Sequence, residues 1–405
     1  MSKEKRSVPK LRFPGFTEDW EQRKLGDIAT FSKGNGYSKS DLTPSGDPII
    51  LYGRLYTNYE TTISNVDTFV ELKDKSLISQ GGEVIVPASG ETAEDISRAS
   101  VVKNQGIIIG GDLNVIKVNH LLDPTFLALT ISNGEQQKEL SKRAQGKSVV
   151  HLHNSDLQEV NLTFPLLNEQ KEISTLFEKM DNIITLHQRK LEHLNLKKKA
   201  LLQKLFPKNG ERYPELRFPG FTDAWEQRKA DYIFKSVTDK GYPELPVLSA
   251  SQELGMVYRD QNGIDIQHDK KNEASYKRVL PGQFVIHLRS FQGGFAYSEI
   301  EGITSPAYTV INFKNSNEQY GLFWKHVFKS ETFIKRLETI TYGIRDGRSI
   351  SFSDFKSLIL WYPSFSEQKL IGDSLAVVEK GITLHQRKLE HLQLQKKALL
   401  QQMFV

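Results

Sequence analysis

The clearest hydrophobic pattern in the chain follows Pro165, where apolar residues recur at steps of three and four among charged side chains. This spacing predicts a helix over residues 168–205 that packs as a coiled coil. Its seam positions are Leu176, Met180, Ile183, His187, Leu191, Leu194, Leu201 and Leu205, with Lys198 filling the one gap. Such a helix would be roughly 57 Å long at a rise of about 1.5 Å per residue. Pro207 and Gly210 then end it.

A second stretch near the end of the chain repeats this seam in register. Its positions are Val378, His385, Leu389, Leu392, Leu399 and Met403. Two similar long helices, one closing each half, pack most simply as an antiparallel pair; the alternative is a helical hairpin that only completes a core. His187 and His385 are polar seam residues, and such residues more often fix register than bind metal.

The helices belong to an internal repeat. Leu11–Lys24 (LRFPGFTEDWEQRK) and Leu216–Lys229 (LRFPGFTDAWEQRK) differ at two positions and are offset by 205 residues. Ile184–Phe206 matches Ile382–Phe404 at an offset of 198. The seven-residue difference must lie in the stretches between the matched blocks, so the chain is a duplicated frame that carries two different inserts.

The two inserts, roughly 25–163 and 230–361, do not resemble each other. Both have short apolar runs between Gly, Pro, Asn and Asp residues, which is typical of strands joined by turns. Leu113–Val118 alternates like a strand with one buried face, Pro124–Asn133 has the pattern of a helix, and a helical stretch runs from Glu318 to about Leu337. We predict an α+β fold with loop-rich inserts. A duplicated frame with two different inserts should present two equivalent docking surfaces and two different recognition surfaces. The alternative is that the inserts diverged without purpose.

Composition narrows the classes of function. The chain has 405 residues, a formal net charge of +5 and no cysteine, which excludes disulfides, a thiolate nucleophile and a Cys-based zinc site. A charge this small means that any DNA binding rests on local patches. The charged segment Met1–Lys10 is unlike a signal peptide, and no apolar run has membrane-spanning length. We expect a soluble, cytoplasmic protein.

Catalytic motifs are missing. Gly146-Lys147-Ser148 is similar to the end of a phosphate-binding loop, but the required glycine five residues earlier is Ser141. His151 and His153 form a lone His-x-His without a carboxylate cluster, so a buried or DNA-facing pair is favoured over a metal site. No nucleophile elbow, Asn/Asp-Pro-Pro-Tyr methyltransferase motif or nuclease cluster is found. We expect no enzyme activity and no cofactor in this chain.

Residues suited to reading DNA lie in both inserts, because base edges and phosphates are bound by basic, amide and hydroxyl side chains. The candidates in the first insert are Lys33, Tyr37, Lys39, Arg54, Tyr56, Ser89, Arg98, Lys147 and Ser148. Those in the second are Tyr258, Arg259, Lys277, Arg278, Arg289, Arg345, Arg348 and Ser349. A Gly-Lys-Ser or Gly-Arg-Ser triplet closes each insert, which favours contact with DNA there. Any single basic residue is otherwise more often a solvated surface charge.

The order of these parts resembles the specificity subunit of type I restriction-modification systems. The resemblance covers nearly the full length and rests on the repeated opener (Leu11–Phe16 with Trp20), the variable insert, the long helix, and a Pro-x-x-x-Glu-Gln stretch at Pro165–Gln170 and Pro363–Gln368. It implies two target recognition domains that read a split double-stranded DNA sequence, with the helices as a ruler. It also implies docking of two methyltransferase subunits and of translocating nuclease subunits. S-adenosylmethionine and ATP with magnesium would belong to those partners.

The resemblance gives the expected domain order. We expect a first recognition domain over 1–165, a spacer helix over 166–207, a second recognition domain over 208–363 and a second spacer helix over 364–405. The two helices should be antiparallel and related by a pseudo-twofold axis. Two alternatives stay open: a coiled-coil scaffold with two peptide-binding modules, whose affinity would depend less on salt, and a self-sufficient nuclease or methyltransferase, which would transfer methyl groups without a partner.

Overall fold

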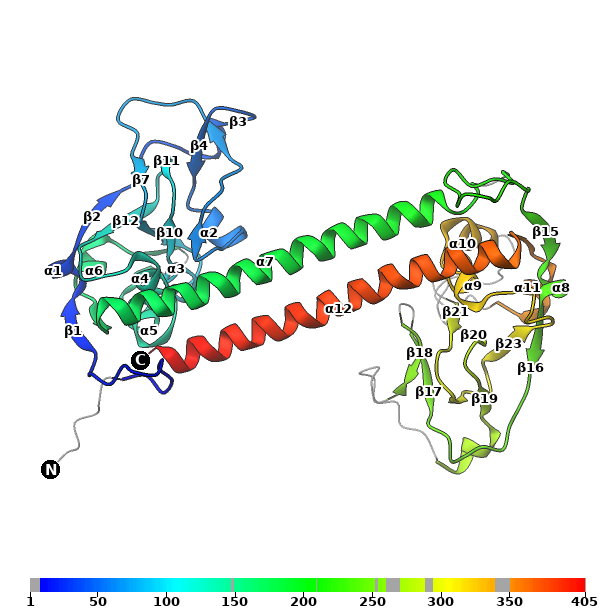
Figure 1. Cartoon of the computed structure of the whole chain (residues 1–405). Helices are drawn as coiled ribbons and strands as arrows, with labels where there is room; N and C mark the ends of the chain where they lie inside the picture. The colour runs from blue at the N-terminus through cyan, green and yellow to red at the C-terminus, as the bar shows by residue number, and fades with distance from the viewer. Residues whose placement is uncertain are drawn as a thin grey trace. The chain divides into compact units, whose positions relative to one another are not determined.

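The computed structural model describes residues 8–146, 149–208, 210–251, 254–259, 270–287, 294–338 and 350–404. The chain divides into two compact units (Figure 1). Unit 1 consists of Met1–Arg189 with His385–Val405, and unit 2 of Lys190–Leu384. Each unit therefore contains one insert and a part of each long helix.

Unit 1 is built on two five-stranded sheets. The first has the order β2 (Ala29–Lys33), β12 (Leu113–Val118), β8 (Glu83–Pro87), β10 (Ser100–Val102), β5 (Thr62–Ile63). The second has the order β3 (Leu42–Thr43), β6 (Phe69–Val70), β4 (Asp47–Ile50), β11 (Gln105–Ile109), β7 (Ile78–Gln80). Two-stranded ladders join β1 (Glu21–Lys24) to β14 (Asn161–Phe164) and β9 (Ser89–Gly90) to β13 (Val150–His151). The helices are α1 (Leu25–Ile28), α2 (Arg54–Thr57), α3 (Ala93–Ile96), α4 (Pro124–Ile131), α5 (Gly134–Arg143) and α6 (Asn154–Gln158), with a 3-10 turn η1 (Lys39–Asp41).

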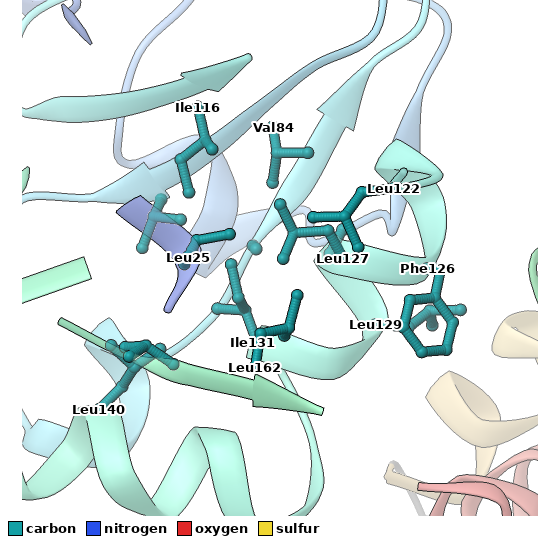
Figure 2. Packing of buried hydrophobic residues seen from close by; sticks show 14 of the residues in the cluster. Leu25, Val84, Ile116, Leu122, Phe126, Leu127, Leu129, Ile131, Leu140 and Leu162 are labelled. Carbon is teal, nitrogen blue, oxygen red and sulfur yellow. The ribbon is translucent and has the colours of Figure 1, made fainter. Parts of the chain in front are cut away.

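The main core of unit 1 lies between the first sheet and α4 (Figure 2). Asp123 begins α4, because its carboxylate accepts the Phe126 N–H at 2.9 Å and Pro124 occupies the first turn. Phe126 and Leu127 are then fully buried in this core. The helix predicted from Pro124 is confirmed.

Strand β12 differs from the prediction in its burial. Leu113, Asn114, Val115 and Ile116 are all buried, although the sequence predicted one buried face. The strand is central, between β2 and β8. Ile116 packs in the main core, while Leu113 and Val115 pack in a second cluster. Both faces of the sheet are covered here, and Asn114 is accommodated because its amide donates to the Leu152 carbonyl at 2.8 Å.

Unit 2 has a smaller set of sheets. A four-stranded sheet has the order β16 (Phe234–Val237), β23 (Thr309–Phe313), β20 (Phe284–Ile286), β21 (Phe295–Tyr297). Two-stranded ladders pair β15 (Glu226–Lys229) with β24 (Ile359–Tyr362), β17 (Leu248–Ser251) with β18 (Gly255–Tyr258), and β19 (Lys277–Val279) with β22 (Gly302–Thr304). The helices are α8 (Ala230–Ile233), α9 (Gly321–Val327), α10 (Glu331–Glu338) and α11 (Phe352–Ser357), with a 3-10 helix η3 (Lys270–Ser275).

The helical stretch predicted from Glu318 to about Leu337 is two helices, α9 and α10. The chain leaves the first helix after Val327, and the Ser330 hydroxyl accepts the Phe333 N–H at 3.3 Å, as at a helix start. The break lets Phe328 and Phe333 pack against each other with ring centroids 4.9 Å apart in an aromatic core.

The long helices are α7 (Leu167–Lys204) and α12 (Phe365–Met403). In unit 1, Asp181 of α7 binds Lys396 of α12 at 2.5 Å, and the Nδ1 atoms of His187 and His385 are 2.7 Å apart. Because the contact positions rise along α7 while they fall along α12, the two segments are antiparallel, as predicted. The α+β class and the two long helices are confirmed. One seam position is wrong: Ile183 is 43% exposed.

The repeat places the same anchor in each unit. Arg12 donates to both oxygens of the buried Glu169 at 2.8 and 2.6 Å. Arg217 donates to both oxygens of Glu367 at 2.7 Å. Each pair ties the opening Leu-Arg-Phe-Pro segment of a half to the first turn of the long helix that closes it, and this contact defines the frame at atomic level.

Candidate DNA-recognition surfaces

Tyr37 holds its own loop in place. It is 8% exposed, its hydroxyl lies 2.6 Å from Ser76 Oγ, and it accepts the Lys73 backbone N–H at 2.7 Å. The Lys73 ammonium lies 4.7 Å from the ring centroid. The ring is therefore occupied by contacts within unit 1, whereas the neighbouring candidates Lys33 and Lys39 are exposed.

Arg54 is also held by internal contacts. Its guanidinium donates to Asp67 at 2.9 Å, to Glu60 at 2.8 Å and to the Asn65 carbonyl at 3.0 Å. The side chain is 12% exposed. Two carboxylates neutralise this charge, so the residue stabilises the loop after α2.

Three candidates of the first insert come together. The Tyr56 hydroxyl donates to the Ser89 carbonyl at 2.8 Å. The Arg98 guanidinium lies 5.6 Å from the Tyr56 ring and 5.5 Å from the Tyr59 ring, and it donates to Asp95 at 2.9 Å. Burial raises the pKa of Tyr56 to about 12, so its hydroxyl stays a neutral donor. Arg98 and Tyr59 also line a depression of about 250 Å³.

An exposed histidine pair lies beside this group. His151 pairs with Ser89 across the β9–β13 ladder. The rings of His151 and His153 are stacked with centroids 6.3 Å apart and an interplanar angle of 4°. Both side chains are exposed, so the buried interpretation is wrong and contact with DNA stays a prediction. Lys147 and Ser148, just before them, lie outside the described residues.

Lys277 and Arg278 of the second insert lie on β19 with different surroundings. Lys277 Nζ donates to the Tyr308 carbonyl at 2.6 Å, and burial lowers the pKa of this lysine. Arg278 donates to Glu301 through Nε at 2.8 Å and Nη2 at 2.6 Å, and its guanidinium lies 4.5 Å from the Tyr242 ring. The hydrogen bond to Glu301 raises the pKa of Arg278. Arg278 is thus positioned from two sides.

Tyr258 and Arg259 lie at the end of β18. Tyr258 is half-buried and packs against the small apolar cluster around Leu248 and Met256. Arg259 has Nε and Nη1 atoms that are buried and bind no hydrogen-bond partner in the described part of the chain. Such donors are costly to bury unpaired. The other candidates of this insert, Arg289, Arg345, Arg348 and Ser349, lie outside the described residues.

The structure thus sorts the candidates by availability without testing whether any of them contacts DNA. Lys33 and Lys39 are exposed, Tyr56, Ser89 and Arg98 form one group, and the side chains of Tyr37, Arg54 and Arg278 are bound internally. Sequence reasoning missed Tyr242 and did not include His151 and His153 among the candidates. The His-x-His spacing was the available signal for the histidines, although only His151 lies on a strand, β13, and His153 directly precedes α6.

Within the described ranges, no group of three or more His, Asp or Glu side chains could hold a metal ion. The same ranges contain no helix that is both long enough and apolar enough to cross a membrane. The candidate site is a set of polar loops and ladders on each unit.

Comparisons with known proteins agree with this arrangement. The family described as type I restriction modification DNA specificity domain matches residues 17–196 and 222–394. The MjaVIII specificity subunit of a type I restriction enzyme from Methanocaldococcus jannaschii is 22% identical, covering 96% of this chain and 92% of its own length. A putative MjaX specificity subunit from the same organism is 21% identical, covering 95% of this chain and 92% of its own.

A solved structure shares the fold. It is the S subunit of a type I restriction-modification system from M. genitalium, with a TM-score of 0.63 and 15% identity, covering 98% of this chain and 99% of that one. The family match includes both inserts and most of both copies of the repeated frame. The chain belongs to the family of type I restriction-modification DNA specificity domains.

Proposed function

We propose that this chain is the DNA sequence-specificity subunit of a type I restriction-modification complex and that each unit reads one part of a bipartite, asymmetric DNA target. The observation that carries the proposal is the repeated anchor, Arg12–Glu169 and Arg217–Glu367, which holds two dissimilar inserts in the same frame. The inserts differ down to their sheets, with two five-stranded sheets in unit 1 and one four-stranded sheet in unit 2. Two different reading surfaces favour a non-palindromic target.

The repeated frame presents equivalent exposed residues that could bind two copies of the same partner. Among the large apolar residues that the long helices expose are two leucines in each unit: Leu186 and Leu394 in unit 1, at 66% and 68% exposure, and Leu196 and Leu384 in unit 2, at 68% and 67%. Leu384 is the copy of Leu186, and Leu394 is the copy of Leu196, at the repeat offset. Exposed apolar side chains at equivalent positions suit a partner present twice. We assign Leu196 and its copy Leu394, one in each unit, to two methyltransferase subunits.

Catalysis belongs to the partners in this proposal. The methyltransferase subunits would bind S-adenosylmethionine, and translocating nuclease subunits would bind ATP with magnesium. The chain itself contributes sequence recognition and assembly, acts on double-stranded DNA in the cytoplasm, and has no catalytic role. Purified chain without partners is expected to transfer no methyl groups to DNA.

Base-resolution methylation mapping tests the proposal. DNA from cells that express the chain with its methyltransferase subunit should carry methyl groups in a motif of two short specified parts around an unspecified spacer. Exchanging residues 25–163 for the insert of a relative should change one part only, while Arg228→Gln, on the exposed face of β15, serves as a control that leaves both parts unchanged. A continuous motif, or methylation that does not depend on this chain, would contradict two reading surfaces.

A further inference from the structure

The positive charge of the chain is concentrated on the second halves of the long helices. Residues 184–206 contain six lysines and arginines against one glutamate, and residues 382–404 contain four against one. The whole chain has a net charge of only +5, so the rest of the chain is net acidic; the first insert is acidic, whereas the second is close to neutral. If the inserts read the bases, most of the electrostatic attraction between this chain and DNA therefore comes from the long helices.

Two of these cations form ion pairs between the two long helices. Lys198 of α7 binds Glu379 of α12 at 2.8 Å in unit 2. Lys396 of α12 binds Asp181 of α7 at 2.5 Å in unit 1. These pairs are copies of each other at the repeat offset. The helix pairing accounts for them and leaves the other basic residues to be explained.

Unit 2 carries an exposed basic face on α7. Lys190, His193 and Lys197 recur at steps of three and four, so they lie on one face of the helix. All three are exposed, and neither lysine takes part in an ion pair within the described ranges. Lys190 and Lys197 are seven residues apart, which is about 10 Å along the helix.

Unit 1 carries the copy of this face on α12. Arg387, Lys388 and His391 are exposed, and neither Arg387 nor Lys388 forms an ion pair with any described residue. Gln395 stands where the first copy has Lys197. Each face therefore carries two permanent positive charges, with Arg387 (the copy of Arg189) in place of a charge at position 395.

We propose that these two basic faces bind phosphates of the unread DNA between the two recognised parts of the target. The inference rests on the proposed function and extends it to the spacer. Lysine ammonium groups act as point charges and neutralise phosphates without reading bases. Phosphates follow one another by about 3.4 Å of helix axis per strand, so the Lys190–Lys197 span matches about three of them. Contacts of this kind suit a spacer whose sequence is not read.

The double variant Lys190→Gln/Lys197→Gln, tested in the complete complex with its methyltransferase subunits, measures the contribution. We expect the slope of log affinity against log salt to become shallower by up to about 1.8, because each lost phosphate contact removes about 0.9. Arg387→Gln/Lys388→Gln should act similarly. The methylated motif should not change, since no base contact is lost. The control is Lys171→Gln/Lys179→Gln, which removes the same charge from exposed positions in the first half of α7.

A second probe locates the contact on the DNA. A duplex with uncharged methylphosphonate linkages only in the spacer should weaken wild-type binding and make its salt slope shallower. The same duplex should affect the Lys190→Gln/Lys197→Gln variant less, because that contact is already lost.

Three outcomes distinguish phosphate binding by the two basic faces from the proposed function itself. An unchanged salt slope in both variants would overturn the inference while leaving the proposed function intact, provided that the wild type still binds its bipartite target. An unchanged slope together with weaker methyltransferase assembly would overturn it in favour of a protein partner for these faces. A wild-type complex without sequence-specific binding would instead refute the proposed function.

Discussion

His187 and His385 are copies of each other in the repeat, and they contact each other. Their Nδ1 atoms lie 2.7 Å apart and their ring centroids 5.0 Å apart. A residue that contacts its own copy marks a local twofold relation between the two helices. The bond nevertheless requires one Nδ1 to donate and the other to accept. The two identical side chains thus differ in whether Nδ1 carries a proton.

Removing this bond should reveal the coupling between the two histidines. We expect His187→Ala and His385→Ala each to lower the free energy of unfolding of unit 1, and the double variant to cost less than their sum. The coupling energy should be about 0.5–1.5 kcal/mol, the usual net value of one hydrogen bond. Urea unfolding of the four proteins measures it, with the exposed His193→Ala as control. Strictly additive effects would mean that the contact contributes no stability.

The buried anchor should matter more than surface ion pairs. Glu169 is 1% exposed, so Arg12→Ala leaves a carboxylate buried without its partner. The expected cost is about 3–5 kcal/mol for unit 1, and Arg217→Ala should cost unit 2 a similar amount.

The matched control for the anchor is Arg228→Ala. Arg228 pairs with Glu226, and both side chains are more than half exposed. Its removal should cost less than about 1 kcal/mol. Thermal or urea unfolding checks the three variants, and equal effects of Arg217→Ala and Arg228→Ala would contradict the role of the anchor.

Much of the fold could be predicted because the long helices and the frame have strong local signals. The seam of three- and four-residue steps predicted α7 and α12, and Asp123 with Pro124 marked the start of α4. The burial of β12 could not be predicted, since it depends on which elements cover both faces of the sheet. The break between α9 and α10 was not predicted, because the sequence pattern of a short helix does not show that Phe328 and Phe333 pack against each other.

The candidate site was less predictable because composition does not show whether a charge is already neutralised. Arg54 has the residue type expected of a DNA contact, yet Glu60 and Asp67 lie far enough along the chain that their pairing with it follows only from the fold. Tyr37 is similar, since its ring is buried by contacts made 36 residues later with Lys73. Lys33 and Lys39 differ from these residues because their side chains are exposed. The sequence does not show this, since exposure depends on how the loop folds.

His326 should make unit 2 less stable in mild acid. Its side chain is 1% exposed, and burial lowers its pKa from 6.5 to about 4. Between these values the unfolded chain binds a proton that the folded chain does not, so stability falls as the pH falls from about 6.5 to 4. The size is roughly 3 kcal/mol at most, at about 1.4 kcal/mol per pKa unit.

The test compares unfolding midpoints at pH 7, 6, 5 and 4. The variant His326→Leu removes this proton and should lose less stability across the window than the wild type, whereas the exposed His193→Leu should follow the wild type. The informative quantity is the difference between variant and wild type, because other groups also titrate in this range. A difference that does not depend on pH would show that the burial of His326 is not linked to folding.

The anchoring of the two opener segments predicts that the chain can be cut and rejoined elsewhere. The Leu11 N–H donates to the Gln402 carbonyl at 2.9 Å, and the Leu216 N–H donates to the Lys204 carbonyl at 2.8 Å. Leu11 and Gln402 are the copies of Leu216 and Lys204. One opener is thus anchored to the helix that precedes it in sequence, and the other to the helix at the far end of the chain.

A circular permutant should therefore fold and keep its specificity. Fusing Val405 to Met1 gives a connector of 13 residues between Gln402 and Leu11, close to the 11 residues that join Lys204 to Leu216. New termini between Asn209 and Gly210 avoid every helix and strand in the described ranges. Because the anchoring contacts do not depend on where the chain is cut, this permutant should show the wild-type methylation motif and a similar unfolding midpoint. Opening the fused chain between Arg189 and Lys190, inside α7, should lose stability instead, and equal behaviour of the two permutants would mean that the continuity of α7 is not needed.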